Sequence, residues 1–379
     1  MNVYLDYNAT TPVDKRVLEE MLPYFSEKFG NAASTSHTFG RIAKDAVEVA
    51  RKQVSDFLNC IESEIVFTSG ATEAINLAIK GVAEAYKSKG KHIVILESEH
   101  KAVIDTCEHL EKQSYEISRI PILRDGMADP DKISAAIRPD TILVCVMLAN
   151  NETGVIQPIN EIAEIVHEKK SILFTDATQA CGKIRVDVNE LHVDILCISA
   201  HKIYGPKGVG ALYIRRKNPR VTIHAQIDGG GHEKNLRSGT LNVPGIVGLG
   251  KACELSAANL WEESSRLSYL RTILEQKLTE TGNVFINGNI KNRLPNTTNL
   301  CFHDFIAEKL LLLMPEISLA TGSACSSALP EPSHVLLSMG LSKEDAYSSI
   351  RFSLGRFTTE DEIEYVIKKF NSVIMEKMN

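Results

Sequence analysis

The chain has 379 residues, of which 44% are hydrophobic and 24% are charged. This composition is typical of a globular protein with a sizeable core, so it excludes a disordered chain, a collagen-like chain and a small disulfide-stabilised scaffold. The formal net charge of -6 offers no overall attraction to a polyanion, and we therefore expect no direct binding of nucleic acid.

The N-terminal residues predict neither a targeting signal nor a membrane anchor. They carry no basic stretch followed by an apolar one, and apolar runs such as the one at 310–314 are too short to cross a bilayer. The eight cysteines are dispersed singly, without the CxxC pairs that would suggest zinc or a redox motif. We therefore expect a cytoplasmic protein that binds no membrane, contains no disulfide framework and requires no metal.

Alternating strands and helices follow in chain order. Residues 39–58 predict an amphipathic helix, because apolar residues recur there at helical spacing between charged ones. Short apolar runs rich in β-branched residues come next, separated mostly by helical stretches: EIVFT (64–68), HIVIL (92–96), TILVCVML (141–148), ILFTD (172–176) and DILCIS (194–199). This alternation predicts an α/β fold with a mostly parallel sheet covered on both faces.

The pattern changes after Gly250. A long helical stretch precedes strand-like TTNLCF (297–302), helix-like AEKLLLLM (307–314), strand-like SIRFSL (349–354) and a closing helix from Glu360. This mixed order predicts a second, smaller α+β domain. We expect a large domain at residues 15–260 and a small domain formed by residues 1–14 and 261–379.

Four successive strand exits bring polar side chains to one edge of the predicted sheet. These are His100, Asn151, Asp176 and Lys202, each placed just after or at the end of an apolar run. Alone, each has an ordinary interpretation as a helix cap, a structural histidine or a surface charge. Together they lie where ligands bind to parallel sheets. An acidic group and a lysine are also what pyridoxal phosphate needs for its ring nitrogen and its Schiff base.

The segment TSGATEA (68–74) lies between a predicted strand and a predicted helix. Free backbone N–H groups and the helix dipole at such a junction attract a phosphate dianion. A simple helix N-cap would give the same pattern, so this motif is weak evidence by itself.

Cys325 lies in SLATGSACSSALPEPSH (318–334), whose small and turn-forming residues predict an exposed, mobile loop. A cysteine there is a nucleophile, an oxidation-prone thiol or a tolerated residue. Arg351, in a later strand-like run, is either a clamp for a carboxylate or one half of a surface ion pair.

Taken together, these motifs resemble those of the cysteine desulfurases, fold type I pyridoxal-phosphate enzymes, particularly the group with a long active-site loop. The resemblance covers nearly the whole chain, because several long motifs occur in the same order: YLDYNATTPVD (4–14), FGNAASTSH (29–37), FTSGATEAINLAIKG (67–81), SAHKIYGPKGVGALY (199–213), GGGHEKNLRSGT (229–240), GSACSSALPEPSHV (322–335) and RFTTEDEIEYV (356–366).

The resemblance implies pyridoxal 5'-phosphate as cofactor. Lys202 would form the Schiff base and later remove the substrate's α-proton, Asp176 would pair with the ring nitrogen, and His100 would stack on the ring and shuttle protons. Gln179 would bond the ring hydroxyl. The remaining cofactor contacts would come from Ala71, Thr72, Asn151, Ser199 and His201 and, from the other subunit, Thr240.

The resemblance also implies the substrate and the partners. Asn151 and Arg351 would hold the carboxylate of L-cysteine, and Cys325 would take its sulfur as a persulfide while L-alanine is released. Thr240 implies an obligate homodimer. The sulfur would pass to an acceptor protein, such as an iron–sulfur scaffold or a tRNA-thiolation protein. Which acceptor, and whether Cys325 also ligates a transferred iron–sulfur cluster, stays open.

Three alternatives remain beside this interpretation. The chain could be a selenocysteine lyase, a pyridoxal-phosphate aminotransferase or a non-enzymatic sulfur-relay component loaded by another protein. An aminotransferase needs no nucleophilic cysteine, so dependence on Cys325 would discriminate. A relay component with a degenerate cofactor site is disfavoured, because Lys202, Asp176, His100 and Gln179 are all present.

Overall fold

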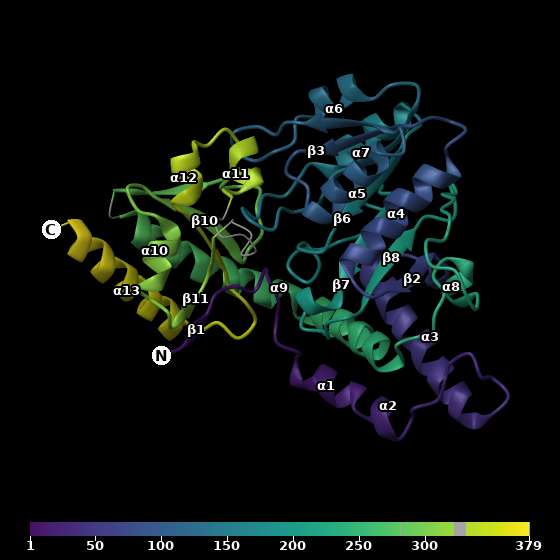
Figure 1. Ribbon diagram of the computed structural model, residues 1–379. Helices are drawn as coiled ribbons and strands as arrows, with labels where there is room; N and C mark the ends of the chain where they lie inside the picture. Colours follow the sequence, from purple (N-terminus) through teal and green to yellow (C-terminus); the bar gives the residue numbers. More distant parts are fainter. Residues whose placement is uncertain (281, 322–330, 379) are drawn as a thin grey trace.

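The computed structural model describes residues 1–280, 282–321 and 331–378, with side chains described up to residue 375. Within these ranges the chain forms two lobes joined by one long helix, α9 (Val243–Thr279), as Figure 1 shows. No helix of the described residues is long and apolar enough to span a membrane.

A seven-stranded sheet forms the larger lobe. Its strands, in spatial order, are β2 (Ile65–Thr68), β8 (Gly210–Ile214), β7 (Ile195–Ser199), β6 (Ile172–Asp176), β5 (Thr141–Cys145), β3 (His92–Leu96) and β4 (Glu116–Ile120). Strand β8 is antiparallel to both of its neighbours, and the other neighbouring pairs are parallel. The expected α/β fold with a mostly parallel sheet is confirmed.

Helices cover both faces of this sheet, which is why its strands are so apolar. Along β3, Val94 and Leu96 belong to one buried cluster and Ile93 and Ile95 to the other, as the alternation of strand side chains requires. The helices of this lobe are α1 (Lys15–Met21), α2 (Pro23–Ser26), α3 (Thr38–Leu58), α4 (Ala71–Ala85), α5 (Lys101–Glu111), α6 (Pro130–Ala136), α7 (Ile159–Glu168) and α8 (His232–Asn235), with short 3₁₀ turns at Glu62–Glu64 and Ala200–Lys202.

The expected amphipathic helix at 39–58 is present as α3, and its ends have clear causes. His37 caps its start, with Nδ1 accepting the N–H of Gly40 at 3.2 Å. Asn59 ends it in the left-handed conformation, at a φ of 55°, which asparagine tolerates better than most residues.

The smaller lobe has an antiparallel sheet and a core of its own. Its sheet has the order β12 (Ala320–Thr321), β13 (Ser349–Ser353), β10 (Thr297–Phe302) and β9 (Val284–Asn287), and β1 (Val3–Tyr4) pairs in parallel with β11 (Ile317–Ser318). Its remaining helices are α10 (Ala307–Leu312), α11 (His334–Ser338), α12 (Lys343–Tyr347) and α13 (Glu360–Met378).

Segments from both ends of the chain build the core of the smaller lobe. Leu5 packs in one cluster with the second half of α9 and with Phe302, Phe352 and Phe370. The first half of α9 belongs instead to the core of the larger lobe, as do Val335 and Leu336 of α11. The domain division at 15–260 and at 1–14 with 261–379 stays a prediction.

Candidate functional site

A cavity of about 670 Å³ lies at the carboxyl edge of the seven-stranded sheet. The ends of β6 and β7, the starts of α4 and α5, the segment 8–10 and strand β13 all contribute to its wall. Ten residues singled out from the sequence line it: Ala71, Thr72, His100, Asn151, Asp176, Gln179, Ser199, His201, Lys202 and Arg351. The structure thus brings together side chains that are up to 280 positions apart in the sequence (351 minus 71).

The N-terminus of α4 forms one wall of the cavity and can hold an anion. Gly70 is its N-cap and has no side chain to accept the N–H groups of the first turn, while its φ of 148° favours glycine. A Cβ atom at Gly210 would lie only 2.8 Å from the Gly70 Cα, so the close approach of β8 also needs a glycine. With Thr72 and Ser199 alongside, this turn fits a phosphate group.

Lys202 follows β7 in a 3₁₀ turn and points into the cavity. Its Nζ donates to the backbone oxygens of Asn8 and, at 2.6 Å, Ala9. Burial, with a smaller effect of the Arg351 charge, lowers the pKa of Lys202 to about 8. A sizeable fraction of the amine is therefore neutral near neutral pH, as attack on an aldehyde requires.

Asp176 and His100 occupy the same cavity. Asp176 ends β6 and is buried, and its Oδ1 accepts the N–H of Thr178 at 2.9 Å. A carboxylate in this place suits a protonated ring nitrogen. His100 caps α5, with Nδ1 accepting the Ala102 N–H at 3.1 Å, so the neutral ring carries its proton on Nε2. Burial lowers the pKa of His100, which favours this neutral form.

His201 and Gln179 complete the wall around Lys202. The Nδ1 of His201 lies 3.2 Å from the Thr10 hydroxyl, and burial followed by the charge of Lys202 lowers its pKa to about 4. Gln179 donates from Nε2 to the backbone oxygen of Asn8 at 2.9 Å. The backbone of Asn8 thus accepts hydrogen bonds from both Gln179 and Lys202.

Arg351 reaches the cavity from β13 of the smaller lobe. Its two terminal nitrogens donate to the Asn151 backbone oxygen at 3.1 Å and to Asp6 Oδ1 at 2.6 Å. Its buried Nε has no partner among the described residues. A guanidinium with a free donor beside Asn151 is suited to a substrate carboxylate.

A second cavity, of about 710 Å³, shares His100, Asn151 and Arg351 with the first. Leu311, Leu312, Pro315 and Leu319 form much of its apolar side. Cys325, expected to be the nucleophile, lies outside the described residues.

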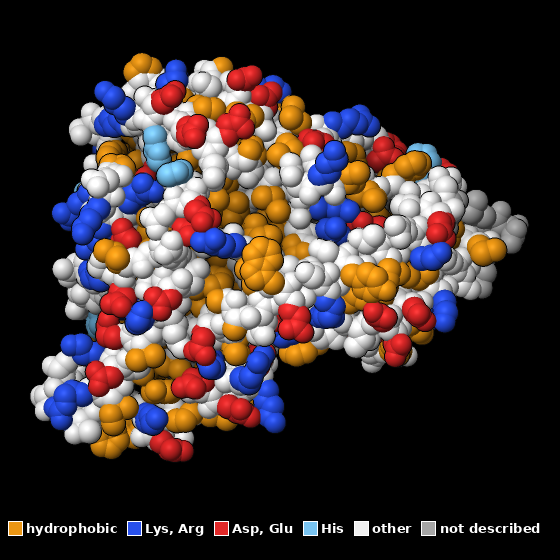
Figure 2. Space-filling view, turned by 180° about the vertical axis from the view of Figure 1, so that it is seen from behind, with side chains coloured by type: hydrophobic (Ala, Val, Ile, Leu, Met, Phe, Trp, Pro, Cys, Tyr) orange, Lys and Arg blue, Asp and Glu red, His pale blue; other side chains and the backbone are white. Residues whose placement is uncertain are grey.

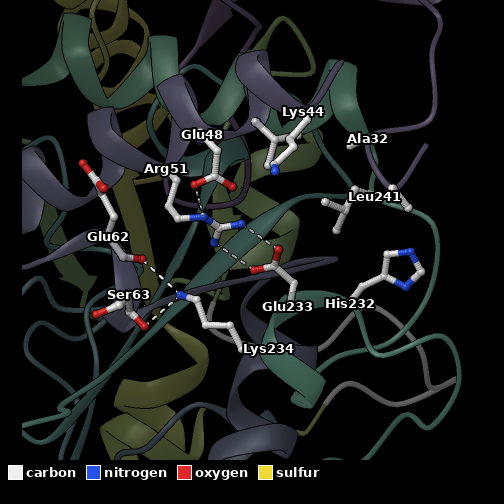
Figure 3. Close-up of a pocket in the computed structure, with 12 residues that line it drawn as sticks. Ala32, Lys44, Glu48, Arg51, Glu62, Ser63, His232, Glu233, Lys234 and Leu241 are labelled. Atoms are coloured by element: carbon white, nitrogen blue, oxygen red, sulfur yellow. Dashed lines mark hydrogen bonds and ion pairs between the residues drawn. The ribbon is translucent and has the colours of Figure 1, made fainter. Parts of the chain in front are cut away.

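Thr240 is exposed and lies away from both cavities. It follows a turn in which Glu233, Lys234 and Asn235 all have left-handed backbones, with φ of 47°, 60° and 64°. Such strain persists only where the surrounding structure holds it. In Figure 3 the Glu233 carboxylate faces Arg51 of α3, and its oxygens accept from the guanidinium at 2.7 and 2.9 Å.

A second contact connects the segment that carries Thr240 to the turn at the start of α4. Arg237 donates to Glu73 of α4 at 2.8 Å, and Glu73 also accepts the N–H of Ser69 at 2.9 Å. The segment that carries Thr240 is thus fixed to the turn at Ser69–Thr72 of its own subunit.

Several residues that line the cavity have no role predicted from the sequence, among them Asn8, Thr10 and Met147. Asn8 and Thr10 lie in YLDYNATT, which has no helical or strand period, so only its place in the resemblance could have drawn attention to it. Met147 reads as one more apolar residue of a strand run.

Comparisons with known proteins indicate the family of the chain. The family model described as aminotransferase class-V matches residues 3–366. "Cysteine desulfurase IscS" of Anaeromyxobacter dehalogenans (strain 2CP-C) is 52% identical, over 98% of this chain and 92% of its own length. The protein of the same name from Neisseria meningitidis serogroup C (strain FAM18) is 49% identical over the same shares.

Solved structures also match over nearly the whole chain. One described as a NifS-like protein has a TM-score of 0.93 and 38% identity, covering 99% of this chain and 100% of its own. Another, described as SspA in complex with cysteine, has a TM-score of 0.83 and 36% identity, covering 94% and 100%. The class-V family implies pyridoxal 5'-phosphate, and the cavity has the groups to hold it. Because relatives named cysteine desulfurase are about half identical over nearly the whole chain, the chain belongs to the cysteine desulfurase family of pyridoxal-phosphate enzymes.

Proposed function

We propose that the chain removes sulfur from L-cysteine, releases L-alanine and carries the sulfur as a persulfide on Cys325. The observation that carries this proposal is the meeting of Lys202, with its lowered pKa, and Asp176 and Arg351 in one cavity. The cavity thus combines a nucleophilic amine (Lys202), a partner for a ring nitrogen (Asp176) and a group that can bind the substrate carboxylate (Arg351).

The residues of the cavity would hold pyridoxal phosphate as follows. The first turn of α4, with Ala71, Thr72, Ser199 and His201, would hold the phosphate, and Asp176 the ring nitrogen. Gln179 would donate to the ring oxygen and Lys202 would bind the aldehyde carbon. When bound, the cofactor withdraws electrons from the substrate's α-carbon and so eases removal of the proton there and of the sulfur on the next carbon.

The side chains of the protein then perform three tasks. Arg351 and Asn151 fix the substrate carboxylate, which orients the α-carbon toward Lys202. The Nζ of Lys202 takes the α-proton, and Nε2 of His100 exchanges protons with the substrate. The Cys325 thiolate attacks the substrate sulfur: an S–S bond forms as the C–S bond breaks, and L-alanine leaves after the carbon is reprotonated.

The other cysteines are poor candidates for this attack. Burial raises the pKa of the thiol at all seven described positions, Cys60, Cys107, Cys145, Cys181, Cys197, Cys253 and Cys301. Since the thiolate is the nucleophile, these side chains are largely unreactive near neutral pH. This supports Cys325, the eighth cysteine, as the sulfur acceptor.

Peptide mass spectrometry after anaerobic mixing with L-cysteine, without reductant, tests the proposal. We expect one added sulfur on the Cys325 peptide and one alanine per sulfur. The Cys325→Ser variant should keep the yellow cofactor but lose the added sulfur, whereas Cys60→Ser should behave as the parent. Alanine without sulfur on Cys325 would favour direct lyase chemistry, and neither product would favour an aminotransferase or a sulfur-relay component.

We also propose that the protein works as a homodimer in which Thr240 of each subunit donates to the cofactor phosphate of the other. Two observations support this: Thr240 is exposed away from its own cavity, and its segment is fixed to α4. Large apolar side chains are also exposed on and beside the first three helices, among them Leu22, Phe25, Phe29, Phe39 and Val49. Such a surface is typical of an interface.

Thr240→Val tests the shared site. We expect the variant to remain a dimer and to bind pyridoxal phosphate about 10-fold more weakly, the loss typical of one hydrogen bond to a charged group. Absorbance titration of the apo-protein measures the affinity, and Thr222→Val, at another exposed threonine, serves as the control. Unchanged affinity in Thr240→Val would speak against the contact.

We propose that the persulfide passes to an acceptor protein of iron–sulfur cluster assembly or of tRNA thiolation. The surface seen in Figure 2 has acidic and basic side chains interspersed, which fits a protein acceptor better than nucleic acid. A cytoplasmic location, where thiols stay reduced, suits this role and stays a prediction.

A further inference from the structure

Lys183 is a buried lysine behind the cavity. Only 8% of its surface is exposed, and the charge that acts on it most strongly is that of Lys202, which is also positive. An ammonium buried without a carboxylate is costly, and here burial, followed by the charge of Lys202, lowers the pKa of Lys183 to about 7. This cost indicates that Lys183 has a role that offsets it.

Both side-chain hydrogen bonds of Lys183 lead to one residue of the cavity, Gln179. Its Nζ donates to the side-chain oxygen of Gln179 at 2.8 Å and to the backbone oxygen of Gln179 at 3.0 Å. The backbone oxygen of Lys183 in turn accepts the hydroxyl of Ser264, on α9, at 2.6 Å. The backbone of Lys183 is thus held by Ser264, and its Nζ donates two hydrogen bonds to Gln179.

These bonds decide which way the Gln179 amide faces. The ammonium form of Lys183 has donors only at Nζ, so it can donate to the amide oxygen but would oppose donor to donor if the amide were reversed. The NH₂ group is therefore turned the other way, where one hydrogen goes to the Asn8 oxygen at 2.9 Å. The second hydrogen remains for an acceptor in the cavity that Gln179 lines.

We propose that Lys183 is a positioning residue, which locks the Gln179 amide with its NH₂ group toward the cavity and so selects a hydrogen-bond acceptor, the deprotonated ring oxygen of pyridoxal phosphate. The inference rests on the proposed function, since it takes that cofactor as the ligand. In this role Lys183 touches neither cofactor nor substrate and acts through the side chain of Gln179.

A double-mutant cycle tests the proposal. Lys183→Met keeps the length of the side chain but removes the donor, so the amide can reverse. We expect the variant to bind pyridoxal phosphate about 10-fold more weakly, the loss of one hydrogen bond to a charged group. We also expect the visible absorption band of the bound cofactor to shift, because the ring oxygen loses its donor. In the Gln179→Leu background the same change should have no further effect.

The outcomes separate this role from a structural one. A loss of equal size in both backgrounds would overturn the proposal, as would an unchanged absorption band. Lys183→Arg keeps a donor-only cation and should retain the parental band, even if Lys183→Met folds poorly; a shifted band in Lys183→Arg would also count against it. If the parent chain bound no pyridoxal phosphate, the proposed function itself would fail, which is a distinct result.

Discussion

Lys202→Ala is expected to lower the turnover of L-cysteine by about 10²–10⁴-fold, the contribution typical of a positioned proton-transfer group. In the proposed function, Lys202 is both the amine that would bind the cofactor and the base that would take the α-proton, so the substitution removes both. The variant should also lose its cofactor on gel filtration, whereas the parent keeps it. Alanine release and absorbance measure the two effects.

Lys202→Arg is the matched control, because it keeps the positive charge beside Asp176 but supplies no nucleophile. It should fail in the same way as Lys202→Ala. If either variant turned over L-cysteine at the parental rate, Lys202 would have no role in the reaction.

The lowered pKa of Lys202 gives the same residue a pH signature. Only the neutral amine attacks an aldehyde, and its fraction falls about 10-fold for each pH unit below the pKa. Because burial and Arg351 place that pKa near 8, while Asp6 and Asp176 oppose the shift, the rate of cofactor capture by the apo-protein should rise with pH and level off above about 8. A midpoint at the ordinary lysine value would show that the amine is solvated.

Much of the site follows from the order of strands in the sequence. His100, Asn151, Asp176 and Lys202 come after successive parallel strands, whose carboxyl ends must share one edge, so their meeting could be predicted. From its own segment, Arg351 could be interpreted only as a carboxylate clamp or as one half of a surface ion pair, because nothing local shows that β13 of the smaller lobe faces that edge. Lys183 reads as an ordinary lysine in a turn, since burial is not visible in the sequence.

The start of α9 shows a similar limit. The sequence predicted a helical stretch after Gly250, but the helix begins at Val243 and includes Gly245, Gly248 and Gly250. Glycine lowers helix propensity, so these residues read as a loop. Packing explains a glycine within the helix. A Cβ at Gly250 would lie 2.7 Å from the Ala50 Cα of α3, so only glycine lets α9 and α3 come this close.

Glu233→Gln is expected to destabilise the fold by about 3–5 kcal/mol, because it leaves the buried Arg51 charge with only the longer, 3.5 Å contact to the exposed Glu48. Both side chains are nearly inaccessible, and Arg51 also stacks over Phe67, with 4.6 Å between guanidinium carbon and ring centre. Glu233 accepts the Phe67 N–H as well, so its loss disturbs β2 directly. Urea unfolding at one fixed protein concentration measures the change.

The exposed pair of Lys52 and Asp56 on α3 provides the control, since Lys52→Met breaks an ion pair that water screens and should barely change the unfolding midpoint. Joint replacement, Arg51→Met with Glu233→Leu, should recover part of the loss, because no buried charge is then left alone. Equal effects of Glu233→Gln and Lys52→Met would contradict the prediction.

The same ion pair should matter for cofactor binding, through Thr240. Arg51 holds the strained turn at 233–235, from which the chain runs to Thr240. Release of that turn should weaken the proposed contact of Thr240 with the partner's cofactor, so Glu233→Gln and Thr240→Val should show similar losses of affinity where both are folded. Combined in one chain, they should lose little more than either alone, since both act on a single hydrogen bond. A fully additive loss would place the role of Arg51 and Glu233 in stability alone.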